Sequence, residues 1–328
     1  MSTRYYKKKS FSKNIRKVFD NFLIYCIIAE LMLHDIHVSA PAKINIGLRV
    51  LPVRSDGYHD IESIFQTVPL YDELFIRTGN TAVRTCTVVC DGMDLPEHNT
   101  LTAAYDAFCS ATGITDGVAV TLKKRIPSGA GLGGGSADAA AFIKALNVSF
   151  ETKLTADVLH GIAGKVGSDV FFFLSGSSLV DAPDCSGCAV VTGRGEKVFP
   201  ITPRTDLHFV LICPDVHSST GEAYRLVDAY YASGHQDWNG PSREELYDVY
   251  KRPVKSWSFV NSFTEPLVQR YPLIGQALDD LVLNGASYVQ MSGSGSAVFG
   301  VFEDSDKAVH ACFVLGVKWK RCYTFASS

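Results

Sequence analysis

The sequence predicts a protein of mixed α/β (α+β) class with two domains. Its 328 residues, 46% of them hydrophobic and 20% charged, are enough to build two hydrophobic cores. Segments that alternate like β-strands are interspersed with segments that have the period of amphipathic helices. Around residues 200–204 the pattern turns to loop, and a strand-like apolar run begins at 208. We therefore expect a second α/β unit to start there.

The first unit is expected to open with a strand over 38–52, where small and apolar residues alternate. Further strands are predicted over 71–77, 83–90 and 117–123, with a helix over 101–112. Two more helices are indicated by apolar faces, the first formed by Ala139, Phe142, Ile143 and Leu146 and the second by Leu159, Ile162, Ala163 and Val166. Gly167 is expected to end the second helix, and strands over 171–174 and 178–181 to follow it.

The second unit is expected to begin with a strand over 208–213. Residues 237–253 are polar and predict irregular structure. The closing segment, 288–302, has the pattern of a strand, a glycine turn and a second strand.

Charge is distributed unevenly along the chain. Residues 1–31 hold seven Lys or Arg against two acids, a net of +5, so the total of −3 leaves −8 for the rest. An acidic body argues against nucleic-acid binding.

The apolar run 22–33 is short for a membrane span and is broken by Glu30, so we expect no stable membrane association. Signal-peptide cleavage near residue 40 would cut into the first strand; we expect instead that translation starts at Met32 and that 1–35 lie outside the fold.

The nine cysteines are odd in number and irregularly spaced, which favours reduced thiols and a cytoplasmic location. Cys185 and Cys188 form one CxxC pair. A zinc site needs two further ligands, and no second pair has suitable spacing, so we predict no protein-bound metal there.

The most informative segment is PSGAGLGGGSADAAA, residues 127–141, a glycine-dense loop that enters a helix-forming alanine stretch. Glycines let the backbone amides approach an anion, and the following helix adds its N-terminal dipole. We expect this loop to bind the phosphates of a nucleotide. Its predicted binding residues are Pro127, Ser128, Gly129, Ala130, Gly131, Leu132, Gly133, Gly134, Gly135, Ser136 and Ala137.

Several kinds of glycine loop share this composition. A Walker A loop is excluded, since Ser136 directly follows Gly135 where a lysine is required. Glycines 129, 131 and 134 match the dinucleotide pattern GxGxxG, with Glu151 as a candidate ribose acid, but a charged segment and Pro127 separate them from the preceding strand. A mobile linker is a further alternative.

Three segments together resemble the GHMP small-molecule kinases: APAKINIGLRV (40–50), the glycine loop, and MSGSGSAVFGVF (291–302). RSDGYHDIESIFQTVPLYDEL (54–74) is similar to one branch, whose alcohol acceptor is 4-diphosphocytidyl-2-C-methyl-D-erythritol. The resemblance covers residues 36–302. It implies an N-terminal ATP-binding domain of the S5 domain 2-like type over 36–200 and a ferredoxin-like C-terminal domain over 201–328. It also implies ATP and magnesium as cofactors, a small-molecule partner, and a monomer or homodimer.

The resemblance assigns catalysis to two residues. Asp169 would accept the proton of the acceptor hydroxyl, and Lys43 would be its ionic partner. A carboxylate kept ionised by an ammonium is chemically suited to that task. The role of Asp169 does not depend on Phe171, which stands where the family has proline, although the replacement could alter the expected strand start.

Substrate recognition is assigned in the same way. Tyr58 and His59 match the pair that contacts the nucleobase, Tyr224 would stack on the other face of the pyrimidine, and Asn45 would bind the erythritol or the catalytic pair. Ser136 would cap its helix or approach the metal or the β-phosphate. The helix dipole accounts for Asp138 in the first turn.

One departure and three rivals remain open. Residues 261–264, Asn-Ser-Phe-Thr, stand where the family pattern is Asn-Asp-x-Glu, so two expected acids are lost in the second domain. The rivals are a mevalonate- or homoserine-type kinase, a nicotinamide-dependent oxidoreductase, and a catalytically inactive nucleotide-binding module.

Overall fold

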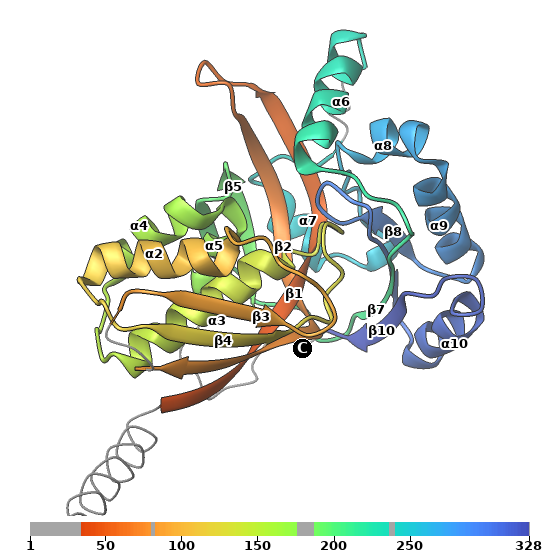
Figure 1. Ribbon diagram of the computed structural model, residues 1–328. Helices are drawn as coiled ribbons and strands as arrows, with labels where there is room; N and C mark the ends of the chain where they lie inside the picture. Colours follow the sequence, from red (N-terminus) through yellow and green to blue (C-terminus); the bar gives the residue numbers. More distant parts are fainter. Residues whose placement is uncertain (1–33, 80–82, 176–186, 236–239, 328) are drawn as a thin grey trace, which may run out of the picture.

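The computed structural model describes residues 34–79, 83–175, 187–235 and 240–327, which form two β-sheets with their helices (Figure 1). The first sheet has the order β3-β4-β2-β5-β6, with β1 paired to β2. Its pairs are antiparallel except β3–β4. Its strands are β1 (His34–Val53), β2 (His59–Thr78), β3 (Cys86–Cys90), β4 (Val118–Lys123), β5 (Cys188–Gly193) and β6 (Lys197–Pro200).

Four helices pack with this sheet: α2 (Thr100–Thr112), α3 (Gly134–Ser149), α4 (Ala156–Val166) and α5 (Ser168–Ser175). Helix α3 contacts β1, β2, α2, α4 and α5, so it lies at the centre of the layer. Its predicted apolar face, Ala139, Phe142, Ile143 and Leu146, is buried, as the helical period requires. The glycine loop connects β4 to α3 and is thereby fixed at both ends.

The second sheet is antiparallel with the order β10-β7-β9-β8. Its strands are β7 (His208–Ile212), β8 (Tyr288–Met291), β9 (Val298–Phe302) and β10 (Cys322–Ala326). In chain order this is 4-1-3-2, the arrangement of a ferredoxin-like sheet, so the predicted fold class is confirmed. Its helices are α6 (Thr220–Ala232), α7 (Leu246–Lys251), α8 (Thr264–Arg270), α9 (Pro272–Leu283) and α10 (Ser305–Leu315), with a short 3-10 turn η1 (Val254–Ser256).

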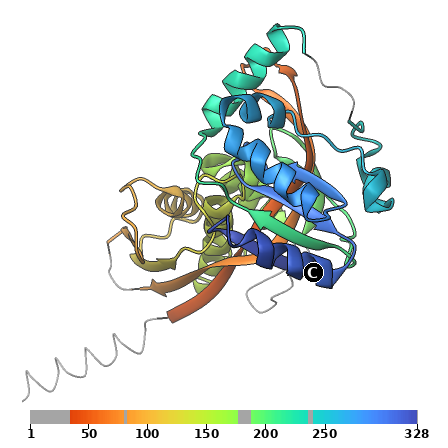
Figure 2. The same ribbon diagram turned by 90° about the vertical axis from the view of Figure 1, so that its right-hand side faces the viewer.

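Helices α9 and α10 contact the strands of the second sheet and lie in front of it in Figure 2. Strand β1 contacts the second unit where Leu48 forms an isolated bridge with Asn261, in the segment before α8, and the Leu48 N–H donates to the Val260 carbonyl at 2.7 Å. Because β6 ends at Pro200 and β7 begins at His208, we propose the domain division between them.

Most predicted elements are confirmed, including the helix over 101–112 and the strand, glycine turn and strand over 288–302. The strand predicted over 171–174 is wrong, since those residues belong to helix α5. Val170, Phe172 and Phe173 are buried, and Phe171 packs on His160 of α4 at 4.4 Å between ring centroids. Tertiary packing against neighbouring helices outweighs the strand propensity of these aromatic residues. The strand predicted over 178–181 lies outside the described residues.

One other expectation needs correction, and one confirmed strand is longer than predicted. Residues 237–253 are not wholly irregular, because they contain α7, whose Leu246, Val249 and Tyr250 are buried. The strand predicted over 71–77 is the second half of β2, which runs 20 residues from His59. Within the described ranges, none of the helices has the length and apolar character needed to cross a bilayer.

Candidate active site

Strand β1 carries the two polar side chains at the centre of the site. Lys43 and Asn45 are two positions apart, so they lie on the same face of the strand, while the alternate residues Ala42, Ile44 and Ile46 are buried in the core. The Lys43 ammonium donates to Asn45 Oδ1 at 2.6 Å and to the Gly131 carbonyl at 3.1 Å. Asn45 was expected to contact either the acceptor or the catalytic pair, and in this structure it binds the lysine.

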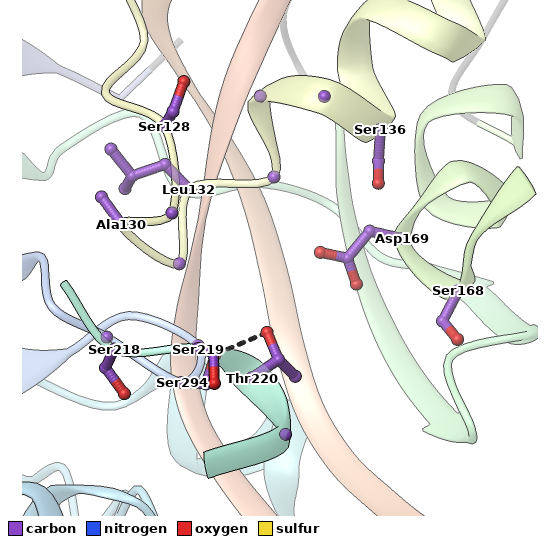
Figure 3. A pocket seen from close by; sticks show the side chains of 18 of the residues that line it. Ser128, Ala130, Leu132, Ser136, Ser168, Asp169, Ser218, Ser219, Thr220 and Ser294 are labelled. Carbon is purple, nitrogen blue, oxygen red and sulfur yellow. Dashed lines mark hydrogen bonds between the residues drawn. The ribbon is translucent and has the colours of Figure 1, made fainter. Parts of the chain in front are cut away.

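The acid partner comes from the first turn of α5. Asp169 Oδ2 lies 3.3 Å from Lys43 Nζ. The lysine side chain is 4% exposed and the aspartate side chain 29%, so the carboxylate is the member of the pair that faces the cavity. In Figure 3 Asp169 points toward the open space between the glycine loop and α6. The structure therefore brings together the two residues to which catalysis was assigned.

The glycine loop has a conformation that other residues rarely adopt. Gly129, Gly131 and Gly133 have φ values of 68°, 76° and 69°. A Cβ on Gly131 would lie 2.1 Å from the Ser292 carbonyl oxygen, so the third motif packs directly on the loop. The Gly131 carbonyl accepts a hydrogen bond from Ser292 Oγ at 2.9 Å.

Further backbone bonds fix the loop from both sides. The Leu132 carbonyl accepts from the Lys43 N–H at 2.9 Å, and the Ala130 carbonyl accepts from the Ala297 N–H at 3.1 Å. Carbonyl groups are thus used to anchor the loop to β1 and to the β8–β9 turn. Amides of the loop and of the first turn of α3 remain the groups suited to an anion.

Helix α3 begins without a side-chain cap. Its N-cap is Gly133, and no side chain accepts from its first-turn amides, so the interpretation of Ser136 as a cap is wrong. Ser136 lies inside the first turn, and its hydroxyl points toward the side of the cavity where Asp169 lies (Figure 3). An uncapped helix N-terminus favours an anionic ligand.

Asp138 also differs from the expectation. It lies beyond the first turn of α3 and is 2% exposed, and its Oδ2 accepts from Lys124 Nζ at 2.9 Å. Lys124 in turn contacts Asp72, which accepts from the backbone of residues 125 and 126. Burial raises the pKa of Asp138 to about 7. A charge cluster, rather than the helix dipole, accounts for this residue.

One cavity of about 930 Å³ contains nearly all the predicted site residues. Those that line it are Lys43, Asn45, Tyr58, His59, Asp169, Tyr224 and each loop residue from Pro127 to Ser136. Ala137 does not line the cavity, because its side chain is buried against the core. Figure 3 shows the glycine loop on one side of this space and the start of α6, with Ser219 and Thr220, on the other.

The aromatic residues assigned to the nucleobase lie at one end of the cavity. The rings of His59 and Tyr224 stack on each other at 5.2 Å, and Tyr224 meets Phe263 edge-on at 5.0 Å. Burial raises the pKa of Tyr224 to about 12, with a smaller contribution from the charge of Asp169. Tyr224 and His59 therefore contact each other and do not flank an open slot. Tyr58 is 52% exposed, and the guanidinium of Arg194 lies over one face of its ring.

Residues 261–264, which depart from the family pattern, support the third motif. Asn261 Nδ2 donates to the carbonyls of Met291 and Gly293 at 2.8 and 2.9 Å. Ser262 Oγ accepts from the Val50 N–H at 3.0 Å. Asn261, which matches the family pattern, therefore holds the glycine turn that packs on the loop, and the replaced Ser262 bonds to β1.

Several cavity residues were not identified from the sequence: Asn99, Thr100, Lys124, Arg194, His217, Ser219, Thr220, Arg225 and Asp228. Asn99 and Ser219 cap α2 and α6, and the sequence signal for a cap was present at both. No sequence pattern marked Arg194 and Arg225 as site residues, because a charged residue in a turn or on a helix usually only faces solvent. In the described part of the chain no three His, Cys, Asp or Glu side chains form a metal-binding group.

Comparison with known proteins identifies the family. Residues 99–177 match the model of the GHMP kinases N terminal domain, and residues 254–315 match that of the GHMP kinases C terminal domain. The chain is 40% identical over 295 residues to the 4-diphosphocytidyl-2-C-methyl-D-erythritol kinase of Treponema pallidum, covering 88% of this chain and 98% of that protein. It is 36% identical over 283 residues to the enzyme of the same name from Chlorobium phaeobacteroides, covering 85% and 93%.

The chain belongs to the 4-diphosphocytidyl-2-C-methyl-D-erythritol kinase family of the GHMP kinases.

A solved structure of a 4-(cytidine 5'-diphospho)-2C-methyl-D-erythritol kinase superposes on this GHMP kinase with a TM-score of 0.67 and 30% identity, covering 89% of this chain and 98% of that one. Homoserine kinase from Cytophaga hutchinsonii gives a TM-score of 0.60 at 20% identity, covering 90% and 94%, which shows a shared fold alone. The GxGxxG match is therefore coincidental, and the oxidoreductase alternative is not supported. The CxxC pair stays untested, since Cys185 lies outside the described residues.

Proposed function

We propose that this GHMP kinase transfers the γ-phosphoryl group of ATP to the 2-hydroxyl of 4-diphosphocytidyl-2-C-methyl-D-erythritol. The observation that carries the proposal is the Lys43–Asp169 pair, 3.3 Å apart, in the cavity that the glycine loop also lines. Relatives at 40% and 36% identity over most of their length bear the name of this enzyme. A phosphate-binding loop and a candidate base in one cavity are the two parts that such a transfer needs.

Proton removal is proposed for Asp169. A tertiary alcohol is a weak nucleophile at neutral pH, and a carboxylate beside it accepts the proton as the O–P bond forms. The Lys43 ammonium, 3.3 Å from the carboxylate, holds Asp169 in place. Asn45 and the Gly131 carbonyl fix the ammonium in turn, so the base is oriented before the acceptor arrives.

Phosphate binding is proposed for the loop from Pro127 to Ser136 and the uncapped start of α3. Magnesium fits this site, because the ion usually takes few protein ligands and keeps water and phosphate oxygens around it. Ser136, whose hydroxyl points into the cavity, would hold it together with the phosphates (Figure 3). When bound, the ion would neutralise charge on the transferring phosphate.

Recognition of the cytidyl group is proposed for the end of the cavity that holds Tyr58, His59 and Tyr224. His59 is fixed through both ring nitrogens, by the Leu51 carbonyl at 2.7 Å and by Asp228 at 3.2 Å. Tyr224 packs on its ring, so the imidazole has a set orientation. Tyr58 offers an exposed aromatic surface for stacking. The cytoplasmic location and a monomeric or homodimeric state remain predictions.

A coupled assay of ADP release tests the proposal. Protein with magnesium and ATP should release ADP when the cytidyl diphosphate acceptor is added, and mevalonate or homoserine should give no stimulation. Product analysis should find one new phosphate on the 2-hydroxyl. ADP release with mevalonate or homoserine but not with the cytidyl acceptor would reject the substrate. ADP release with none of these alcohols would favour the inactive module. Proteins starting at Met1 and at Met32 should be assayed in parallel.

A further inference from the structure

The cations that line the cavity fall into two pairs. Lys43 is bound by Asp169, Asn45 and the Gly131 carbonyl, and Lys124 is bound by Asp72 and Asp138. The other two cations are Arg194 and Arg225. Within residues 34–79, 83–175, 187–235 and 240–327, neither arginine forms an ion pair with a carboxylate. Among the described residues, Arg194 and Arg225 are therefore the lysine or arginine side chains of the cavity that have no carboxylate partner.

Arg194 is held in the turn between β5 and β6. Its neighbours Gly193 and Gly195 have φ values of 68° and 113°, and its own N–H donates to Glu196 Oε2 at 2.6 Å. A Cβ on Gly195 would lie 3.0 Å from Cβ of Ser168. The turn thus packs against the residue that precedes Asp169, and its position relative to the candidate base is fixed.

The guanidinium of Arg194 lies over the ring of Tyr58, with 3.6 Å between Cζ and the ring centroid. Stacking on an aromatic face orients a guanidinium while its N–H groups stay available at the edge. Asp56 is an acid whose pKa is affected by the charge of Arg194, but its carboxylate already forms an ion pair with Arg54 at 2.8 Å. The pKa of Asp56 is lowered first by the hydrogen bond from the Tyr58 N–H, and Arg194 contributes least of the named causes. Asp56 therefore does not serve as the ion-pair partner of Arg194.

The proposed acceptor carries a diphosphate that must enter a cavity already holding the triphosphate of ATP. Bringing two polyanions together requires positive charge beyond that engaged by the phosphate donor. We propose that Arg194, stacked on Tyr58, binds the diphosphate of the acceptor and so selects a nucleoside diphosphate ester over an acceptor without a diphosphate. This inference rests on the proposed function and adds a specificity-determining residue to it.

Arg225 is the natural comparison. It lines the same cavity and, like Arg194, is exposed, but in the described part of the chain no aromatic ring stacks on it. A free arginine loses more side-chain entropy on binding than one already oriented. The structure therefore favours Arg194, and Arg225→Met is a matched control for loss of one positive charge at the same cavity.

Binding of CDP and of cytidine, measured by calorimetry, tests the inference without requiring turnover. The wild type should bind CDP more tightly than cytidine by about 10- to 100-fold, the range of one or two hydrogen bonds to a charged group. Arg194→Met should bring that ratio close to one, Arg194→Lys should restore part of it, and Arg225→Met should leave most of it. Loss of the ratio in Arg225→Met but not in Arg194→Met would overturn the assignment, as would a wild type without preference for CDP.

Kinetics give a second readout that a purely structural role would not produce. Arg194→Met should raise the KM of the acceptor by about 10- to 100-fold, with kcat and the KM of ATP changed only a few-fold. A fall in kcat at unchanged acceptor KM would place Arg194 on the transferring phosphate and overturn the inference. A wild type that shows the Arg194-dependent CDP preference but never phosphorylates the acceptor would reject the proposed function alone.

Discussion

Lys43 and Asp169 form an ion pair of 3.3 Å although 126 positions separate them in the chain. Strand β1 supplies the lysine, and the first turn of α5 supplies the aspartate. Both elements pack on α3, whose N-terminus carries the glycine loop. A single helix thus sets the distance between the candidate base, its partner and the phosphate site.

Replacing Asp169 by Asn should remove the proton acceptor and keep the shape of the side chain. We expect kcat to fall by about 10²- to 10⁴-fold, since the base acts in the transition state, with a small change in the KM of either substrate. Steady-state ADP release measures both constants. Near-normal turnover of this variant would contradict the assignment of Asp169 as the base.

Replacing Lys43 by Met should leave the carboxylate of Asp169, Asn45 Oδ1 and the Gly131 carbonyl without their shared donor. We expect the free energy of unfolding to fall by about 1–3 kcal/mol, the cost of stranding buried acceptors. Urea denaturation of Lys43→Met, Asp169→Asn and the double variant measures the coupling between the two residues. Strictly additive effects would show that the pair does not interact in solution.

Gly131 should tolerate no side chain. Gly131→Ala would place a Cβ at 2.1 Å from the Ser292 carbonyl at a φ of 76°, so the loop and the third motif must separate. We expect weaker ATP binding and a lower melting temperature. Gly161→Ala is the matched control, since that helical glycine has open space around it and the change should stabilise α4 by about 0.5–1 kcal/mol. Equal ATP affinity in the two variants would refute the packing argument.

Asp138 should make stability depend on pH in an unusual direction. Its folded pKa of about 7 lies above the usual value of 3.8, because burial disfavours the charge. The native state therefore holds a proton that the unfolded state has lost between about pH 4 and 7. In that window stability falls as pH rises, by at most about 1.4 kcal/mol per pH unit for one group, and it levels off above pH 7.

Asp138→Asn keeps the shape of the side chain and should remove this contribution. The difference in free energy of unfolding between the variant and the wild type should change across pH 4–7, with the variant gaining relative stability as pH rises. Denaturant titrations at several pH values measure it. A difference that is flat across the window, or that changes in the opposite direction, would show that Asp138 is charged throughout, held by Lys124.

Much of the fold could be predicted because local patterns determine it. The period of Ala139, Phe142, Ile143 and Leu146 predicted a helix, and all four residues are buried. The alternation around Lys43 likewise predicted β1. Residues 171–174 were assigned wrongly, because an apolar run of that length suits a buried strand or a buried helix equally well. Contacts with α4 and β2 decided between the two, and such contacts have no local signature.

The sequence by itself determined the glycine loop, its helix and the family, since these depend on residue types at fixed short spacings. Only the tertiary structure decided what the polar residues face. It placed Asp169 beside Lys43, paired Asp138 with Lys124, and stacked Arg194 on Tyr58 with no ion-pair partner among the residues that the structure describes. Charge interactions act through space, so the partner of a charged side chain is fixed by packing between distant segments and has no trace in the neighbouring sequence.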